Sequence, residues 1–184
     1  MSNKPILEVE KLNVGYQTKD GEIHAVQDVS FKVFSNEVFG IAGESGCGKS
    51  TLIKAIMRLL PENAKMDAHS IKYKDQKIDR MSENIFRNEV LWAQISLVPQ
   101  SAMKSLNPVY KVGEQIVEAI QAHTSQGKKE ARERVEELFD VVGLQSEFMD
   151  SFPHEFSGGM RQRAMIAMAL ALDPGLIIMD EPTT

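Results

Sequence analysis

The stretch Gly43-Glu44-Ser45-Gly46-Cys47-Gly48-Lys49-Ser50 constrains the fold of this chain more than any other. It matches the pattern G-x-x-x-x-G-K-[ST] and follows a continuously apolar run at residues 38–42. A buried strand, a glycine-rich loop and a helix in this order form a phosphate-binding loop. We therefore predict a central parallel strand at 38–42, a helix at about 49–60 that stops before Pro61, and an ATP or GTP site at the loop.

The residue types of this phosphate loop (residues 43–50) suit a triphosphate. Glycines let the backbone wrap the phosphates, N–H groups donate hydrogen bonds, Lys49 neutralises charge and the Ser50 hydroxyl can ligate Mg²⁺. Cys47 lies within the loop, so we predict that Mg-ATP protects it from alkylation; the alternative is a small residue merely tolerated there. The predicted nucleotide-binding residues of this region are Gly43, Ser45, Gly46, Cys47, Gly48, Lys49, Ser50 and Thr51.

A second motif begins with the apolar run at 176–179, which we expect to be another buried strand. Asp180 and Glu181 follow it directly. An acid at the end of such a strand can hold the shell of a Mg²⁺ ion, which we assign to Asp180. The next acid can act as a general base toward water, which we assign to Glu181. Beside a complete phosphate loop, the catalytic interpretation is favoured over a solvated acidic loop.

A third motif is Ser157-Gly158-Gly159, which opens an apolar helix predicted at 157–172. A turn of this kind exposes N–H groups at the end of the helix where the dipole favours an anion. The sequence alone predicts only an anion site here.

The remaining pattern divides the chain into layers. Alternating residues at 7–14 and 29–33 predict an N-terminal antiparallel layer, and a strand is predicted at 95–98. Helical periodicity at 112–123 and 128–142 predicts a mainly helical insert, whereas the polar stretch 61–70 is expected to be a connection. We predict a single domain over 1–184, with an ATP-binding core at 1–100 and 157–184 and a helical subdomain at 101–156.

Composition excludes several other classes. The net charge of −5 argues against electrostatic capture of nucleic acid. The longest uncharged apolar run, 164–172, is far shorter than the roughly 18 residues that span a bilayer. A single cysteine rules out an internal disulfide and fits a reducing compartment, and the four histidines have no spacing typical of metal ligands.

Along the chain the phosphate loop comes first, then the Ser-Gly-Gly helix start, then the apolar strand with Asp180 and Glu181. In this order and spacing, the three motifs resemble the nucleotide-binding domain of an ABC ATPase over essentially the whole chain. The resemblance implies an α/β P-loop NTPase fold of ABC ATPase type, with a mainly parallel core sheet flanked by helices. It implies two such domains packed head to tail, with Ser157, Gly158 and Gly159 contacting the nucleotide bound by the partner. It also implies that Tyr16 stacks on adenine, although an ordinary strand tyrosine is an equal alternative, and that Gln100 senses Mg²⁺ and the attacking water.

The common form of the third motif is Leu-Ser-Gly-Gly-Gln, whereas this chain has Phe156 and Met160 at the two ends. Phe156 to Arg163, with Ser105-Leu106-Asn107-Pro108, resembles importers of oligopeptides, dipeptides or nickel. That resemblance implies permease subunits, a second ATPase subunit and, indirectly, an external solute-binding protein. It places the chain peripherally on the cytoplasmic face of the membrane.

The chain stops just after Asp180 and Glu181, so we expect a truncated domain that lacks its last core strands and the family's switch histidine. We therefore expect residues 1–184 to hydrolyse ATP poorly. Two alternatives stay open: an ABC-type ATPase of DNA maintenance, and a nucleotide-binding fragment without turnover.

Overall fold

A computed structural model describes residues 4–100 and 105–181. It divides into two compact units, Met1–Phe86 and Arg87–Thr184, and each is described by itself. The last three residues of the sequence, 182–184, lie outside the described residues.

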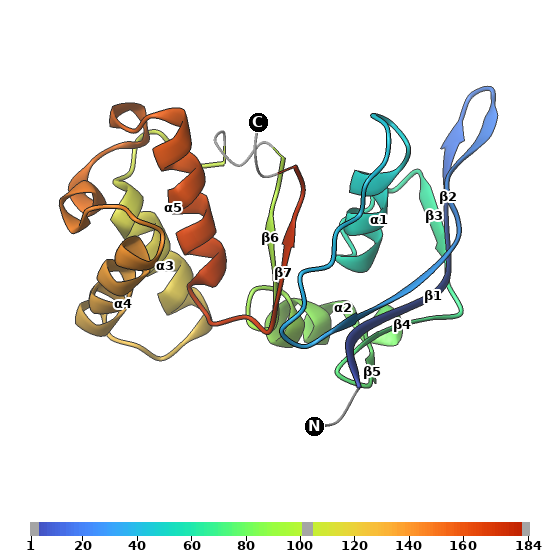
Figure 1. Ribbon diagram of the computed structural model, residues 1–184, viewed down its shortest axis with the longest axis horizontal. Coiled ribbons are helices and arrows are strands. Elements are labelled where there is room, and N and C mark those ends of the chain that lie inside the picture. The colour runs from blue at the N-terminus through green and yellow to red at the C-terminus, as the bar shows by residue number, and fades with distance from the viewer. Residues whose placement is uncertain (1–3, 101–104, 182–184) are drawn as a thin grey trace. The chain divides into compact units, whose positions relative to one another are not determined.

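The first unit is built on an antiparallel sheet (Figure 1). Its long hairpin joins β1 and β2 through a turn at residues 19–20. On the other side of β1, both β3 and β4 pair with it, and β5 pairs with β4. The strands are β1 Pro5–Thr18, β2 Gly21–Phe34, β3 Ala64–Asp67, β4 Ser70–Tyr73 and β5 Gln76–Lys77. The predicted N-terminal antiparallel layer is therefore confirmed and is wider than expected, because the polar stretch 61–70 contains β3.

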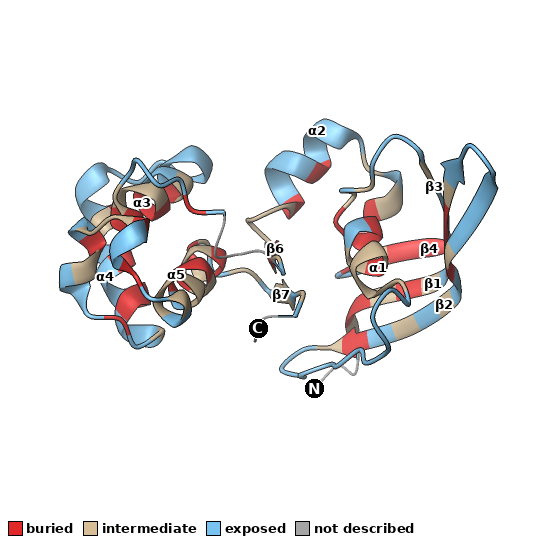
Figure 2. Ribbon diagram, turned by 90° about the horizontal axis from the view of Figure 1, so that it is seen from above, coloured by how far each residue is buried: buried red, intermediate tan, exposed pale blue. Residues whose placement is uncertain are grey.

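Helix α1 (Lys49–Ile56) lies on one face of this sheet (Figures 1 and 2). Leu52, Ala55 and Ile56 are its buried residues. The helix ends earlier than predicted, and Met57 caps it. A 3-10 helix at Ile78–Arg80 and the short α2 (Glu83–Ile85) complete the unit.

The prediction of a buried parallel strand at residues 38–42 is wrong. These residues are neither paired nor helical, and all five are exposed, with Val38 at 101%, Phe39 at 41% and Ile41 at 46%. An apolar run becomes a central strand only where strands pair with it on both sides. Among the described strands none pairs with this run, and the one ring contact recorded here stacks Phe39 on Phe31 of β2 at 5.2 Å.

Glu8 of β1 lies between two lysines of the neighbouring strands. Its carboxylate contacts Lys32 of β2 at 2.5 Å and Lys72 of β4 at 2.9 Å. The hydrogen bond from Lys32, followed by that from Lys72, lowers the pKa of Glu8. These two ion pairs link β1 to both of the strands that flank it.

The second unit combines a parallel strand pair with a helical layer (Figure 1). Strand β6 (Ile95–Val98) pairs in register with β7 (Leu176–Met179). Both strands are where the sequence predicts them, but β7 is only half-buried, because no other described strand pairs with it.

Three helices enclose the core of this unit: α3 (Val112–His123), α4 (Lys128–Val141) and α5 (Gly158–Leu170). The first two match their predicted bounds almost residue for residue, since their apolar residues recur at helical spacing. Ile116, Ile120, Val135 and Phe139 are among the fully buried side chains. The predicted assignment of 157–184 to the same subdomain as 1–100 stays a prediction.

Two composition-based expectations can be compared with the described residues. No helix within them is long and apolar enough to cross a bilayer. Nor do those residues contain a group of three or more His, Cys, Asp or Glu side chains placed to hold a metal ion.

Candidate nucleotide site

The phosphate loop runs directly into α1 in the first unit. Gly46 and Gly48 have φ values of 80° and 100°, a region of backbone space that side chains with a Cβ rarely adopt. A Cβ at Gly48 would also lie 2.3 Å from the carbonyl oxygen of Ala25 in β2. Gly48 is the N-cap of α1 and, as a glycine, brings no side chain that could cap the helix.

Lys49 bends its ammonium group back over this loop. Its Nζ donates to the carbonyl oxygens of Gly43 and Glu44, both at 2.8 Å, and lies 3.9 Å from Cys47 Sγ. The Lys49 ammonium group and the N-terminus of α1 therefore both belong to this loop, and each of them favours a bound anion. Cys47 itself is exposed.

Tyr16 lies beside the loop as well. This half-buried residue of β1 has its hydroxyl 3.2 Å from Thr51 Oγ1, in the first turn of α1. The first unit thus gathers Tyr16 and all the predicted residues from Gly43 to Thr51 around one helix start. This placement leaves Tyr16 beside the loop where a bound nucleotide would lie.

In the second unit, two of the predicted catalytic residues, Gln100 and Glu181, meet at the carboxyl ends of β6 and β7, whereas Lys49 belongs to the first unit. Gln100 Nε2 donates to Glu181 Oε2 at 2.5 Å, although 81 residues separate them. The backbone N–H of Asp180 donates to the Val98 carbonyl at 3.0 Å, which continues the strand pairing up to the acid. The carboxyl ends of parallel strands are where α/β proteins bind their ligands.

The Ser-Gly-Gly turn (residues 157–159) starts α5, as predicted. Ser157 is the N-cap, and its Oγ accepts a hydrogen bond from the Met160 N–H at 3.3 Å. Ser157 and Gly159 are exposed, and a Cβ on Gly159 would meet nothing within 4 Å. The turn is therefore open to another molecule.

The segment that leads to this turn is held by charged side chains. Asp150 binds Arg132 of α4 at 2.7 Å and Lys111 at 3.4 Å. The hydrogen bond from Arg132, with a smaller one from Lys111, lowers the pKa of the Asp150 carboxyl. These contacts connect the end of a 3-10 helix (Ser146–Asp150) to α4 and to the N-cap of α3.

Two arginines that the sequence analysis left without a role also contact this region. Arg161 donates to the carbonyls of Pro153 and Phe156, and Arg163 donates to the Gly143 carbonyl just beyond α4. One signal in the sequence could have indicated Arg161. It is a cation in the first turn of a helix, where the dipole disfavours positive charge, so it needs another partner.

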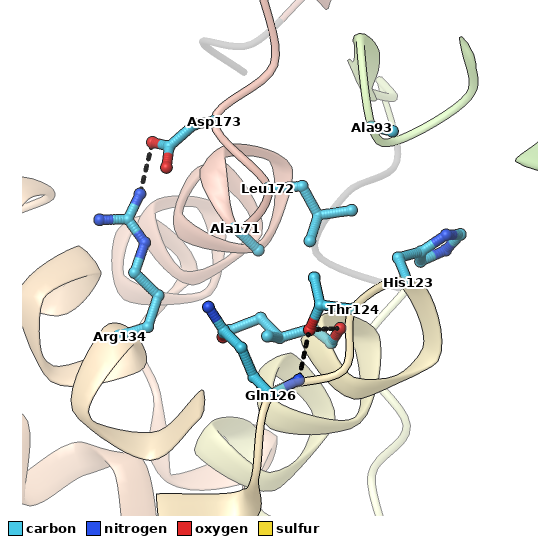
Figure 3. Close-up of a pocket in the computed structure, with 9 residues that line it drawn as sticks. Ala93, His123, Thr124, Gln126, Arg134, Ala171, Leu172 and Asp173 are labelled. Carbon is cyan, nitrogen blue, oxygen red and sulfur yellow. Dashed lines mark hydrogen bonds and ion pairs between the residues drawn. The ribbon is translucent and has the colours of Figure 1, made fainter. Parts of the chain in front are cut away.

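The second unit also contains a cavity of about 320 Å³ (Figure 3). None of the predicted site residues lines it. Its one arginine, Arg134, is paired with Asp173 and Glu137. Because that cation is already neutralised, we assign the cavity no role.

These observations define a class of protein. A glycine-rich loop opening a helix, and acids at the carboxyl ends of a parallel strand pair, characterise P-loop nucleotide-binding proteins. The family model described as ABC transporter matches residues 26–184. The chain belongs to the ABC transporter family.

Several curated relatives of the chain are peptide-transport proteins. It is 43% identical over 182 residues to the dipeptide transport ATP-binding protein DppD of Bacillus subtilis (strain 168), covering 97% of this chain and 54% of that protein. It is 42% identical over 182 residues to the oligopeptide transport ATP-binding protein OppD of the same organism, covering 97% of this chain and 51% of that protein. The chain spans about half the length of the curated relatives it matches.

Solved structures show the same fold. The ATP-binding cassette MJ0796, in a dimeric post-hydrolysis state bound to ADP and Pi, superposes with a TM-score of 0.83 at 24% identity, over 96% of this chain and 74% of that chain. The structure of cbiO1 from Clostridium perfringens gives a TM-score of 0.79 at 28% identity, over 99% of this chain and 67% of that chain. The predicted ABC ATPase fold class is confirmed.

Proposed function

We propose that this chain is the ATP-binding and ATP-hydrolysing part of an ABC importer for dipeptides or oligopeptides. The observation that carries the ATP assignment is the phosphate loop, in which Lys49 Nζ donates to the carbonyls of Gly43 and Glu44 and Gly48 starts α1 without a side-chain cap. The peptide assignment is supported by the printed functions of DppD and OppD, which the chain resembles along almost its whole length. The same relatives favour transport over DNA maintenance.

The phosphate loop binds and neutralises the triphosphate. Its N–H groups donate to the phosphate oxygens, and Lys49 can exchange its bonds to the loop carbonyls for bonds to the β- and γ-phosphates. Tyr16 contacts the adenine, a role that its place beside Thr51 allows.

When a Mg²⁺ ion is bound, Ser50, Asp180 and Gln100 would supply hydroxyl, carboxylate and amide oxygens, the donors that this ion prefers. When bound, it neutralises charge that develops on the phosphate oxygens. Glu181 accepts a proton from the attacking water, whose oxygen bonds to the γ-phosphorus as the bond to the bridging oxygen breaks. Gln100, hydrogen-bonded to Glu181, orients that carboxylate and the water.

The proposed partners are the permease subunits and a second ATPase subunit, with an external solute-binding protein acting through the permease. The chain then works peripherally at the cytoplasmic face of the membrane. Residues 157–159 contact the nucleotide held by the second subunit, a proposal supported by the exposure of Ser157 and Gly159. Catalysis depends on positioning and on charge stabilisation.

The test has two parts. A fluorescent ATP analogue titrated into the chain should bind, and Lys49→Ala should weaken that binding at least about tenfold while leaving the circular dichroism spectrum unchanged. Equal affinities would contradict the phosphate-loop assignment. Cells lacking the gene for this chain should lose uptake of labelled dipeptide but keep uptake of Ni²⁺; the reverse result would replace peptide with nickel as cargo.

A further inference from the structure

Arg161 stands in an electrostatically unfavourable place. It is the fourth residue of α5, and the first turn of this helix contains no acid to offset its charge. The helix dipole places positive potential at this end, so a guanidinium here is destabilised unless it finds other acceptors. Its side chain is partly buried rather than extended into solvent.

The acceptors lie in the segment just before the Ser-Gly-Gly turn. Arg161 Nη1 donates to the Phe156 carbonyl at 2.8 Å and to the Pro153 carbonyl at 3.2 Å. Pro153 begins a 3-10 helix (Pro153–Glu155), and Phe156 is its C-cap. The Arg161 guanidinium is therefore hydrogen-bonded to both ends of the short segment that immediately precedes Ser157.

Phe156 is fixed from its other side by packing. The residue is 3% exposed, and its ring contacts the ring of Phe148 edge to face, with centroids 5.8 Å apart. With the side chain in the core and the carbonyl on Arg161, the peptide between Phe156 and Ser157 has little freedom. This peptide is trans and planar, so fixing its C=O on the guanidinium turns the Ser157 N–H away from it.

Ser157 in turn sets the start of α5. Its Oγ accepts from the Met160 N–H, and its carbonyl accepts from the N–H of Arg161 at 3.0 Å. Arg161 is thus bonded to residue 157 through its backbone and to residue 156 through its side chain, which closes a loop around the exposed turn.

We propose that Arg161 is a positioning residue that orients the Ser-Gly-Gly turn for the nucleotide bound by a second copy of the chain. This inference rests on the proposed function, in which that turn contacts phosphate. It assigns Arg161 no contact with the nucleotide.

The test separates two binding events. In a Glu181→Gln background that slows hydrolysis, Arg161→Ala should keep the affinity of one chain for a fluorescent ATP analogue within about twofold. The same change should weaken Mg-ATP-dependent self-association, measured by sedimentation, at least about tenfold, because two charge-assisted hydrogen bonds are lost. Arg161→Lys retains a cation but not the planar fork, so its association should be intermediate.

Arg163→Ala is the matched control. Arg163 lies on the same helix and also donates to a carbonyl, that of Gly143 at 2.8 Å, but outside the turn. Its removal should leave Mg-ATP-dependent association as in the parent. If Arg161→Ala associates like the parent, or loses ATP affinity and association equally, the positioning role is overturned.

Hydrogen exchange provides a readout that does not need a second copy. The amides of Met160 and residue 161 both bond to Ser157, so they should exchange faster in Arg161→Ala than in Arg163→Ala. A parent chain that fails to self-associate with Mg-ATP would contradict pairing between two copies of this chain, and the exchange rates alone would then decide the role of Arg161. Unchanged rates would overturn it.

Discussion

Two helix starts, one in each unit, offer backbone N–H groups in opposite ways. Helix α1 begins at Gly48, which has a φ of 100° and no side-chain cap. Helix α5 begins at Ser157, whose own hydroxyl accepts from the Met160 N–H. The first start is built so that only glycine fits, whereas the second has ordinary N-cap geometry and is supported by Arg161 behind it.

This contrast indicates two ways of making an anion site. At α1 the anion site is formed by the backbone of the loop itself, and Lys49 adds a positive charge directly over the loop. At α5 the turn is exposed and its shape depends on contacts several residues away. Changes at the first site should therefore be severe and local, and changes at the second milder and dependent on association.

The largest effect is expected for Gly48→Ala. The new Cβ would meet the Ala25 carbonyl at 2.3 Å on a backbone with positive φ, so we expect a loss of about 3 kcal/mol in unfolding free energy. Urea denaturation measures it, and binding of an ATP analogue should fall in parallel. Gly46→Ala, with positive φ but open space, should cost only about 1 kcal/mol. Equal costs would show that the contact with β2 does not matter.

Cys47 tests whether a ligand occupies the loop. With Mg-ATP at about ten times its dissociation constant, alkylation of this exposed thiol should slow by about tenfold, because the bound fraction is shielded. Mass spectrometry of N-ethylmaleimide adducts follows the rate. Identical rates with and without Mg-ATP, in a chain shown to bind ATP, would leave Cys47 as a tolerated small residue.

Ser157→Ala removes the N-cap of α5 in the second unit. Loss of the N-cap should lower the unfolding free energy by about 1 kcal/mol, since Met160 loses its acceptor. Because Ser157 does not belong to the phosphate loop, one chain should bind ATP as before. Ser157→Asn keeps a capping oxygen and should recover most of the stability. A loss of ATP affinity in the monomer would contradict the division of roles.

The smallest effects are expected from two ion-paired carboxylates, one in each unit. The pKa values of Glu8 and Asp150 are both lowered, by Lys32 and by Arg132 respectively. Each carboxylate therefore stabilises the folded chain above its usual pKa, near 4, and this contribution is lost as the pH falls through the lowered value. Glu8→Gln and Asp150→Asn should each lower Tm by about 2 °C at pH 7 and by less near pH 3. A difference that grows on acidification would contradict the pairing.

The sequence predicts elements well where local pattern and final environment agree. Helices α3 and α4 repeat apolar residues at helical spacing, and their core contacts come from neighbours in the same unit. The alternating residues at 7–14 and 29–33 likewise lie in the hairpin of β1 and β2, whose strands pair within one unit. The prediction fails at residues 38–42, where composition indicates burial but the described strands provide no partner.

The site divides in a similar way. The phosphate loop is a contiguous motif, so its residues could be predicted one by one. The contact between Gln100 and Glu181 joins residues 81 positions apart, and only the family resemblance gave Gln100 a role. Arg161 was missed because its carbonyl partners depend on the path of a 3-10 turn, which apolar periodicity does not reveal.

The exposed apolar run at residues 38–42 has a practical consequence for work in solution. An exposed apolar segment, which contains Val38, Phe39 and Ile41, lies directly before the phosphate loop. Short unpaired segments of this composition recruit other chains through backbone pairing. We therefore expect the protein to aggregate slowly at high concentration, whether or not nucleotide is present. Replacing Val38 with lysine should reduce this background and make nucleotide-driven pairing easier to see.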